Sequence, residues 1–146
     1  MQIKLKRLSL DTKTPTKAHS TDACFDIYCD LGKNTAMNIQ PGETVKIKTG
    51  FATEIPEGYY CEVYARSGMG INKGLRPANC VGIIDSDYRG EWVVALHNDS
   101  DTMHTIYHGD RIAQFAVKEV IPCTIEVVEE LSNTDRGDGG FGSTGQ

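Results

Sequence analysis

Residues 79–92 read Asn-Cys-Val-Gly-Ile-Ile-Asp-Ser-Asp-Tyr-Arg-Gly-Glu-Trp. A short apolar run enters this stretch, a polar turn with two aspartates and a glycine follows, and a second apolar run begins at its end. Short apolar runs bounded by turn residues are typical of β-strands, and two such runs around one tight turn predict a β-hairpin. The stretch therefore indicates antiparallel β-structure in the middle of the chain.

The same pattern recurs on both sides of this predicted hairpin. Apolar or alternating runs predict strands at residues 3–6, 44–49, 59–64, 81–84, 92–96, 112–117 and 124–128. Helical periodicity is almost absent, and one helical turn near Met69–Asn72 is all that the pattern predicts. Many short strands separated by Gly and Pro predict an all-β fold of antiparallel sheets, a sandwich or a barrel, with at most one short helix.

Composition and charge narrow the class of protein. A chain of 146 residues with 39% hydrophobic and 24% charged residues predicts one globular domain. The formal net charge of -5 argues against a protein that follows nucleic-acid backbones, since such proteins carry basic surfaces. No apolar stretch suits a membrane span or a signal peptide, and the five scattered cysteines form no C-x-x-C pair. We therefore expect a cytoplasmic protein with reduced cysteines, and neither a membrane nor a nucleic acid as partner.

Two segments are candidates for binding a nucleotide. The inner edge of the hairpin at 79–92 can offer backbone donors and acceptors to a nucleobase, although an ordinary acidic turn explains the same residues. Arg66, Ser67 and Gly68 directly precede the predicted helical turn, where unpaired N–H groups, a hydroxyl and a guanidinium make a phosphate cradle. A strand-to-turn connection with a solvent-facing Arg66 is the alternative.

The last residues of the chain, 135–146, are rich in glycine. Arg136 could meet phosphates, Phe141 could stack on a base, and Ser143 with Thr144 could close on the same ligand. We predict a β domain at residues 1–134 and a flexible arm at 135–146 that folds over a ligand as a lid. A plain flexible tail is the alternative.

Five segments, in this order, closely resemble the motifs of the trimeric dUTPase family. They lie at residues 22–27, 66–68, 82–90, 109–114 and 135–146, and so extend over nearly the whole chain. The resemblance implies a distorted jelly-roll-like β-fold, a homotrimer, and hydrolysis of dUTP to dUMP and pyrophosphate. It also implies three active sites, each built from motifs of all three subunits, with the glycine-rich arm crossing to a neighbour's pocket.

The resemblance assigns roles to the hairpin residues. Asp85 matches the carboxylate that holds and polarises the water attacking the α-phosphorus. Tyr88 matches the residue whose ring packs on the deoxyribose and excludes a 2′-hydroxyl, and Val93 adds a backbone contact. Uracil is bound by the Asn79 side chain and by the hairpin backbone from Gly82 to Asp85, which includes Ile83 and Ile84.

The resemblance also assigns the contacts to phosphates and metal. Phosphates are bound by residues of three motifs, namely Arg66, Ser67, Gly68, Gln114 and Arg136. In the arm, Phe141 stacks over uracil while Gly142, Ser143 and Thr144 close around the phosphates. Mg²⁺ is held chiefly by the phosphates and water, as this hard cation prefers, with Asp26 reaching it through water. Asp22 is a weaker candidate, and Cys24 stands where family members usually have Gly.

Two other functions remain open at this point. The dCTP deaminases share this architecture but carry a Glu-based catalytic arrangement in this hairpin, whereas the D-S-D-Y-R-G turn at 85–90 favours dUTP hydrolysis. A non-catalytic or regulatory partner-binding protein on the same fold is the alternative from another class. That alternative makes the joint presence of Arg66, Asp85, Gln114 and Arg136 accidental.

Overall fold

The computed structural model describes residues 1–140, which contain eleven β-strands and one α-helix. All pairings between these strands are antiparallel. The elements are β1 (Lys4–Arg7), β2 (Phe25–Tyr28), β3 (Ala36–Ile39), β4 (Thr44–Lys48), β5 (Phe51–Glu54), β6 (Tyr59–Tyr64), α1 (Ser67–Lys73), β7 (Leu75–Pro77), β8 (Gly82–Ile84), β9 (Val93–Asn98), β10 (His104–Tyr107) and β11 (Arg111–Glu119).

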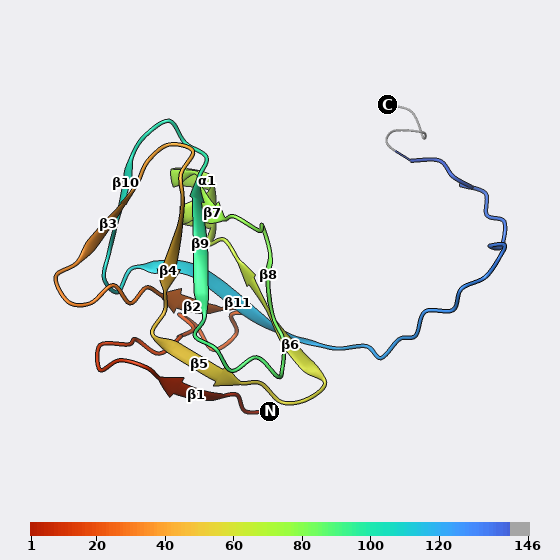
Figure 1. The fold of residues 1–146 in the computed structure, drawn as a ribbon, viewed down its shortest axis with the longest axis horizontal. Helices are drawn as coiled ribbons and strands as arrows, with labels where there is room; N and C mark the ends of the chain where they lie inside the picture. The colour runs from red at the N-terminus through yellow and green to blue at the C-terminus, as the bar shows by residue number, and fades with distance from the viewer. Residues whose placement is uncertain (141–146) are drawn as a thin grey trace.

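The strands form four small sheets around a common core (Figure 1). The largest sheet has the order β2–β11–β6–β8, and a three-stranded sheet has the order β4–β9–β7. Two ribbons, β1–β5 and β3–β10, complete the body. Most neighbouring strands are far apart in sequence, so these sheets form only when distant parts of the chain meet.

Trp92 lies at the centre of the core and is 2% exposed. Its ring centroid is 5.2 Å from that of Phe51 and 5.1 Å from that of Phe115, which come from different sheets. The indole Nε1 donates a hydrogen bond of 3.1 Å to the Thr53 hydroxyl, so the ring's one polar group is satisfied. Because Trp92 directly precedes β9, this packing fixes where β9 begins.

The predicted fold class of antiparallel β-structure with one short helix is confirmed. The helix α1 includes the predicted helical turn, and strands occur at or within two residues of six predicted runs. The pattern does not predict β2, β3, β5, β7 and β10, which have only three or four residues each and so give too short a run to recognise. The described chain has no helix with the length and apolarity to cross a membrane.

The prediction that residues 79–92 form a β-hairpin is wrong. The two strands flank the polar turn as expected, but they belong to different sheets: β8 pairs with β6, whereas β9 pairs with β4 and β7. The strands diverge because Trp92 enters the core at the start of β9, while Gly82 packs against Val63 on β6. The turn therefore connects two sheets instead of closing a ribbon.

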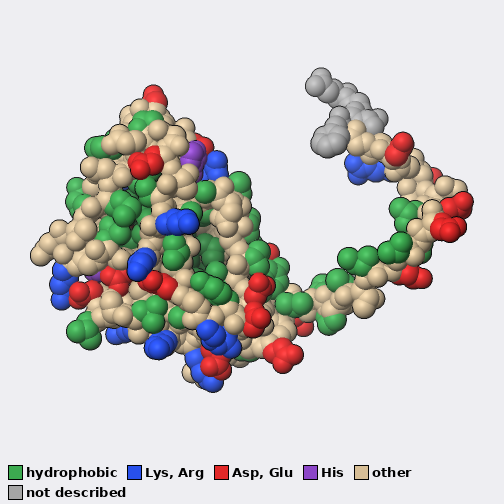
Figure 2. Space-filling view, viewed as in Figure 1, with side chains coloured by type: hydrophobic (Ala, Val, Ile, Leu, Met, Phe, Trp, Pro, Cys, Tyr) green, Lys and Arg blue, Asp and Glu red, His purple; other side chains and the backbone are tan. Residues whose placement is uncertain are grey.

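The prediction of a strand at 124–128 is also wrong. After β11 the chain leaves the body and runs outward through residues 121–140, nearly all of which are exposed (Figure 1). A β-strand requires a neighbour to pair its backbone groups, and the segment lies beside none of the described strands. Its apolar side chains are 82–94% exposed at four positions, Ile121, Ile125, Val127 and Leu131. Figure 2 shows hydrophobic side chains along the outgoing segment.

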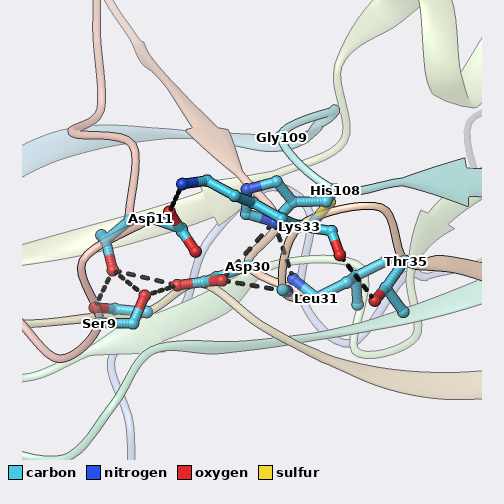
Figure 3. Close-up of polar contacts among 12 residues, drawn as sticks. Ser9, Asp11, Asp30, Leu31, Lys33, Thr35, His108 and Gly109 are labelled. Carbon is cyan, nitrogen blue, oxygen red and sulfur yellow. Dashed lines mark hydrogen bonds and ion pairs between the residues drawn. The ribbon is translucent and has the colours of Figure 1, made fainter.

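A buried carboxylate ties the N-terminal segment to the body (Figure 3). The Asp30 side chain is 9% exposed and accepts hydrogen bonds from the Ser9 hydroxyl and, at 3.1 Å, from the Thr12 hydroxyl. The Gly32 N–H donates to it at 3.3 Å, and His108 Nδ1 lies 3.6 Å away. Burial alone raises the pKa of Asp30, but these hydrogen bonds outweigh it and leave the pKa below its usual value.

Candidate active site

A cavity of about 170 Å³ opens where β8 and β9 diverge. Five residues predicted to lie in the base pocket line it, namely Asn79, Gly82, Ile83, Ile84 and Val93. Because β8 is the edge strand of its sheet, one row of its backbone N–H and C=O groups has no strand partner. Those groups are available to a ligand. In the hairpin predicted from the sequence, pairing between β8 and β9 would have occupied them.

Asp85 and Tyr88 line a second cavity of about 280 Å³, which shares Ile83, Ile84 and Val93 with the first. The Tyr88 hydroxyl donates a hydrogen bond of 3.1 Å to the Glu91 carbonyl. Its ring lies directly over Gly90, where any Cβ atom would collide with it. The glycine in this turn therefore allows the tyrosine ring to fold back beside Asp85, whose side chain is exposed.

The predicted phosphate cradle lies at the start of α1. Arg66 is the N-cap with extended backbone, and α1 begins at Ser67 and is anchored by buried Met69. The first N–H groups of a helix have no partner within it, and here they belong to exposed residues, Ser67 and Gly68. No atom lies within 4 Å of the place a Cβ would occupy at Gly68, so an anion can approach this backbone.

Asp26 on β2 lies between two guanidinium groups beside this cradle. Its Oδ1 accepts a hydrogen bond of 2.6 Å from Arg66 Nε, and its Oδ2 accepts one of 3.1 Å from Arg111 Nη1. Gln114 pairs with Asp26 across β2 and β11, and its Nε2 donates to the Ala65 carbonyl at 2.9 Å. The structure thus brings the predicted residues Asp26, Arg66 and Gln114 together at one end of the largest sheet.

The residues around Asp26 limit how a metal could bind. Asp22 and Asp26 line one cavity together with Arg66 and Arg111. Within residues 1–140, no three His, Cys, Asp or Glu side chains are grouped so that they could hold a metal ion. Each Asp26 oxygen retains a lone pair beyond its bond to a guanidinium, and that lone pair can accept a hydrogen bond from a metal-bound water. The site therefore fits a Mg²⁺ held by phosphates and water, but not one enclosed by protein carboxylates.

The arm residues are not brought to the rest of the site within one chain. Arg136 lies on the segment that runs away from the body, and its Nε donates to the Gly139 carbonyl at 2.8 Å (Figure 1). The remaining predicted arm residues, Phe141, Gly142, Ser143 and Thr144, lie outside the described residues.

The predicted site residues of the body fall into two half-sites. One contains Asp85, Tyr88 and the base cavity, and the other contains Arg66, Gln114 and the start of α1. The cavities beside Asp85 and those beside Arg66 have no lining residue in common. A single chain therefore presents the predicted water-orienting group and the predicted phosphate-binding groups in separate cavities.

Arg111 is the residue of this region that the sequence pattern misses. It belongs to the segment 109–114, but it lies three residues before Gln114, and strict alternation along a strand places such residues on opposite faces. A register shift between Arg111 and Ala113 changes this alternation. The sequence signal for this shift is the consecutive apolar pair Ile112–Ala113, which interrupts the alternating pattern of the strand. Both residues are fully buried in the structure.

An edge-strand cavity beside a carboxylate, together with an arginine at a helix start, is the arrangement expected of a β-sheet protein that binds a nucleotide polyphosphate. A family model described as dUTPase matches residues 11–145. Deoxyuridine 5′-triphosphate nucleotidohydrolases from Hydrogenobaculum sp. (strain Y04AAS1) and Desulfotalea psychrophila are 42% and 48% identical to this chain. These alignments cover 99% and 84% of this chain and 99% and 77% of the relatives.

Solved structures show the same likeness. The Staphylococcus bacteriophage 80alpha dUTPase with dUPNHPP matches with a TM-score of 0.87 and 29% identity over 99% of both chains. A mutant dUTPase from phage phi11 of S. aureus, described with a structural Mg(II) ion, matches with a TM-score of 0.77 and 26% identity over 89% of this chain and 98% of its own. The chain belongs to the dUTPase family, and the predicted jelly-roll-like fold is confirmed.

Proposed function

We propose that this chain hydrolyses dUTP to dUMP and pyrophosphate, with water attacking the α-phosphorus. The observation that carries this proposal is the cavity between β8 and β9, where the predicted base-binding residues lie beside Asp85. The identity of the substrate is inferred from the relatives named as dUTP nucleotidohydrolases, one of which is 48% identical to this chain. As a dUTP diphosphatase, the enzyme lowers dUTP and provides dUMP for thymidylate synthesis.

Uracil is selected by fixed polar groups of β8 and by Asn79. Uracil presents a carbonyl oxygen at its 4-position where cytosine presents an amino group, so cytosine leaves donors facing donors. A buried polar site rejects such a mismatch strongly, because its own groups lose their partners. The Tyr88 ring, held over Gly90, packs on the deoxyribose and leaves no room for a 2′-hydroxyl.

The chemistry depends on orienting a water and neutralising phosphate charge. Asp85 accepts a hydrogen bond from the water and aims it at the α-phosphorus. Gln114 contacts the α-phosphate, while Arg66, Ser67 and Gly68 bind the oxygens of the phosphate chain. A Mg²⁺ bound with the substrate would supply neutralisation of the charge that develops on pyrophosphate, and Asp26 would help to hold it through water.

Three copies of the chain complete each site. The separation of the two half-sites supports this assembly, because Asp85 of one copy can meet Arg66 of another. The outgoing segment after β11 supports it as well, since its four exposed apolar side chains, Ile121, Ile125, Val127 and Leu131, gain burial against a neighbouring copy. The arm at 135–146 then closes the third side, with Arg136 on the γ-phosphate, Phe141 on uracil, and Gly142, Ser143 and Thr144 around the phosphates.

A complementation experiment tests the shared site. The variants Asp85→Asn and Arg66→Gln should each lose dUTP turnover, by about 100-fold or more for Asp85→Asn. After mixing, unfolding and refolding together, random trimers should regain activity, since about a quarter of the sites then combine an intact Asp85 with an intact Arg66. Pyrophosphate release measures turnover, and light scattering measures trimer formation.

The control is Asp87→Asn, which changes an exposed aspartate in the same turn and should keep full activity. No recovery in mixed trimers would show that each chain builds its own site. Full turnover by Asp85→Asn would instead reject the role of Asp85 itself.

The two alternative functions are not favoured by the named relatives. Incubation with dUTP, dTTP, dCTP and UTP plus Mg²⁺ separates them directly, because a deaminase releases ammonia from dCTP and a purely regulatory protein releases no pyrophosphate. We further propose that the enzyme acts on free nucleotide in the cytoplasm and does not bind nucleic acid, consistent with its net charge of -5.

A further inference from the structure

A β-bulge brings Arg111 onto the face of the sheet that carries the phosphate cradle. Arg111 pairs with Tyr28 and Ala113 pairs with Ile27, so two steps along β11 match a single step along β2. Ile112 is the extra residue, and it is fully buried like Ala113. Bulges of this kind redirect a side chain, and here Arg111 joins Gln114 and Asp26 on one face.

Asp26 couples Arg111 to Arg66. Arg66 Nε and Arg111 Nη1 bind different oxygens of one carboxylate that is 13% exposed, so together they fix both its position and its plane. Because Asp26 engages only the Nε of Arg66, the two Nη groups of Arg66 are left to face a phosphate. Both arginines line two cavities beside this cluster.

We propose that Arg111 is a positioning residue for the triphosphate subsite, acting through Asp26 to hold the Arg66 guanidinium in its phosphate-binding orientation. This inference rests on the proposed function. Without Arg111, Oδ2 of Asp26 loses its guanidinium partner and the carboxylate can rotate about its side-chain bond. Arg66 then turns with it, since its Nε is bonded to the other oxygen.

The test is the variant Arg111→Gln, which removes the charge and keeps much of the side chain. The KM for dUTP should rise about 10-fold, as expected for a misplaced binding group, and should rise more than kcat falls. Binding of deoxyuridine, which has no phosphates, should not change. An unchanged KM for dUTP, or an equal weakening of deoxyuridine binding, would overturn the proposal.

A double-mutant cycle distinguishes positioning from direct contact. In an Arg66→Gln background, Arg111→Gln should raise the KM no further, because the group that it positions is already absent. Effects that multiply independently would contradict positioning and assign Arg111 its own phosphate contact. If Arg66→Gln by itself leaves the KM unchanged, the phosphate cradle of the proposed function is wrong. That result is distinguishable from a failure of the inference about Arg111.

Two further variants keep the result interpretable. Arg7→Gln alters an exposed arginine on β1, whose Nη2 donates to the Thr14 hydroxyl, and should keep the wild-type KM. Arg111→Lys retains the charge and one donor toward Asp26, so it should keep more dUTP affinity than Arg111→Gln. Should Arg111→Gln fail to fold, the Lys variant carries the cycle. An equal fold-rise in KM from Arg111→Lys in both Arg66 backgrounds, wild type and Gln, would then refute the proposal.

Discussion

The role of Asp26 depends on neighbours that its residue type does not reveal. A carboxylate in this motif predicts an acceptor of hydrogen bonds, and the resemblance suggests a water bound to Mg²⁺ as the donor. The structure places guanidinium donors from Arg66 and Arg111 on its two oxygens. Both uses are compatible, because each oxygen has two lone pairs. In the proposed function, the residue therefore links phosphate binding and metal binding at one point.

Asp30 is a carboxylate whose role is structural. Replacing Asp30 with Asn should lower the free energy of unfolding at neutral pH by about 2 kcal/mol, because hydrogen bonds from Ser9, Thr12 and Gly32 lose a charged acceptor. Urea unfolding at a fixed protomer concentration measures this difference, since assembly makes stability depend on concentration.

The effect of Asp30 should also depend on pH. The pKa of its carboxyl is lower in the folded chain than its ordinary value, so the folded state binds fewer protons than the unfolded state. The stabilisation is therefore present above about pH 4 and is lost as the pH falls through the folded pKa. Asp101→Asn, at an exposed site, is the control. A difference between wild type and Asp30→Asn that grows on acidification would contradict this account.

At the scale of elements, the divergence of β8 and β9 creates the base cavity. The sequence predicts both strands and the polar turn between them correctly. It does not predict that each strand pairs elsewhere, because pairing depends on partners such as β6 and β4 that are distant in the chain. A true hairpin would have used the backbone groups of β8 that the proposed function assigns to uracil.

Gly82 on β8 provides a test of this cavity. A Cβ at Gly82 would lie 3.3 Å from the Val63 Cβ and 3.4 Å from the Asn79 amide nitrogen, so the methyl group of Gly82→Ala should crowd the pocket between β6 and Asn79. We expect the KM for dUTP to rise about 10-fold, as for a pocket that must accept one extra methyl group. Inhibition by inorganic tripolyphosphate, which needs no base pocket, should be unchanged. Equal weakening of both would mean that the substitution disturbs the whole fold instead.

At the scale of the whole molecule, we propose that one chain is an incomplete enzyme. Its body carries two half-sites whose cavities share no residue, and its end runs outward with apolar side chains exposed. Both features favour assembly, since other copies can cover the exposed apolar surface and can bring the two half-sites together. The proposed trimer follows from these features together with the family.

Removing residues 136–146 tests the arm. Because the arm is proposed to close the site without building the body, kcat for dUTP should fall by about 100-fold while the trimer persists. Pyrophosphate release and light scattering measure the two outcomes, and a chain lacking only Gln146 serves as control. Full activity in the shortened chain would reject the lid, and dissociation into monomers would assign the arm to assembly instead.

The sequence by itself determined the class of fold, the family, and the chemical types of the site residues, because these depend on local periodicity and on motifs such as 82–90 and 109–114. Tertiary structure alone decided how β8 and β9 pair, which face Arg111 occupies, and whether residues 124–128 form a strand. Each of these depends on which distant segment supplies a backbone or charge partner. Hydrogen bonding between strands and packing around Trp92 choose those partners, and neither is encoded within any single stretch of the chain.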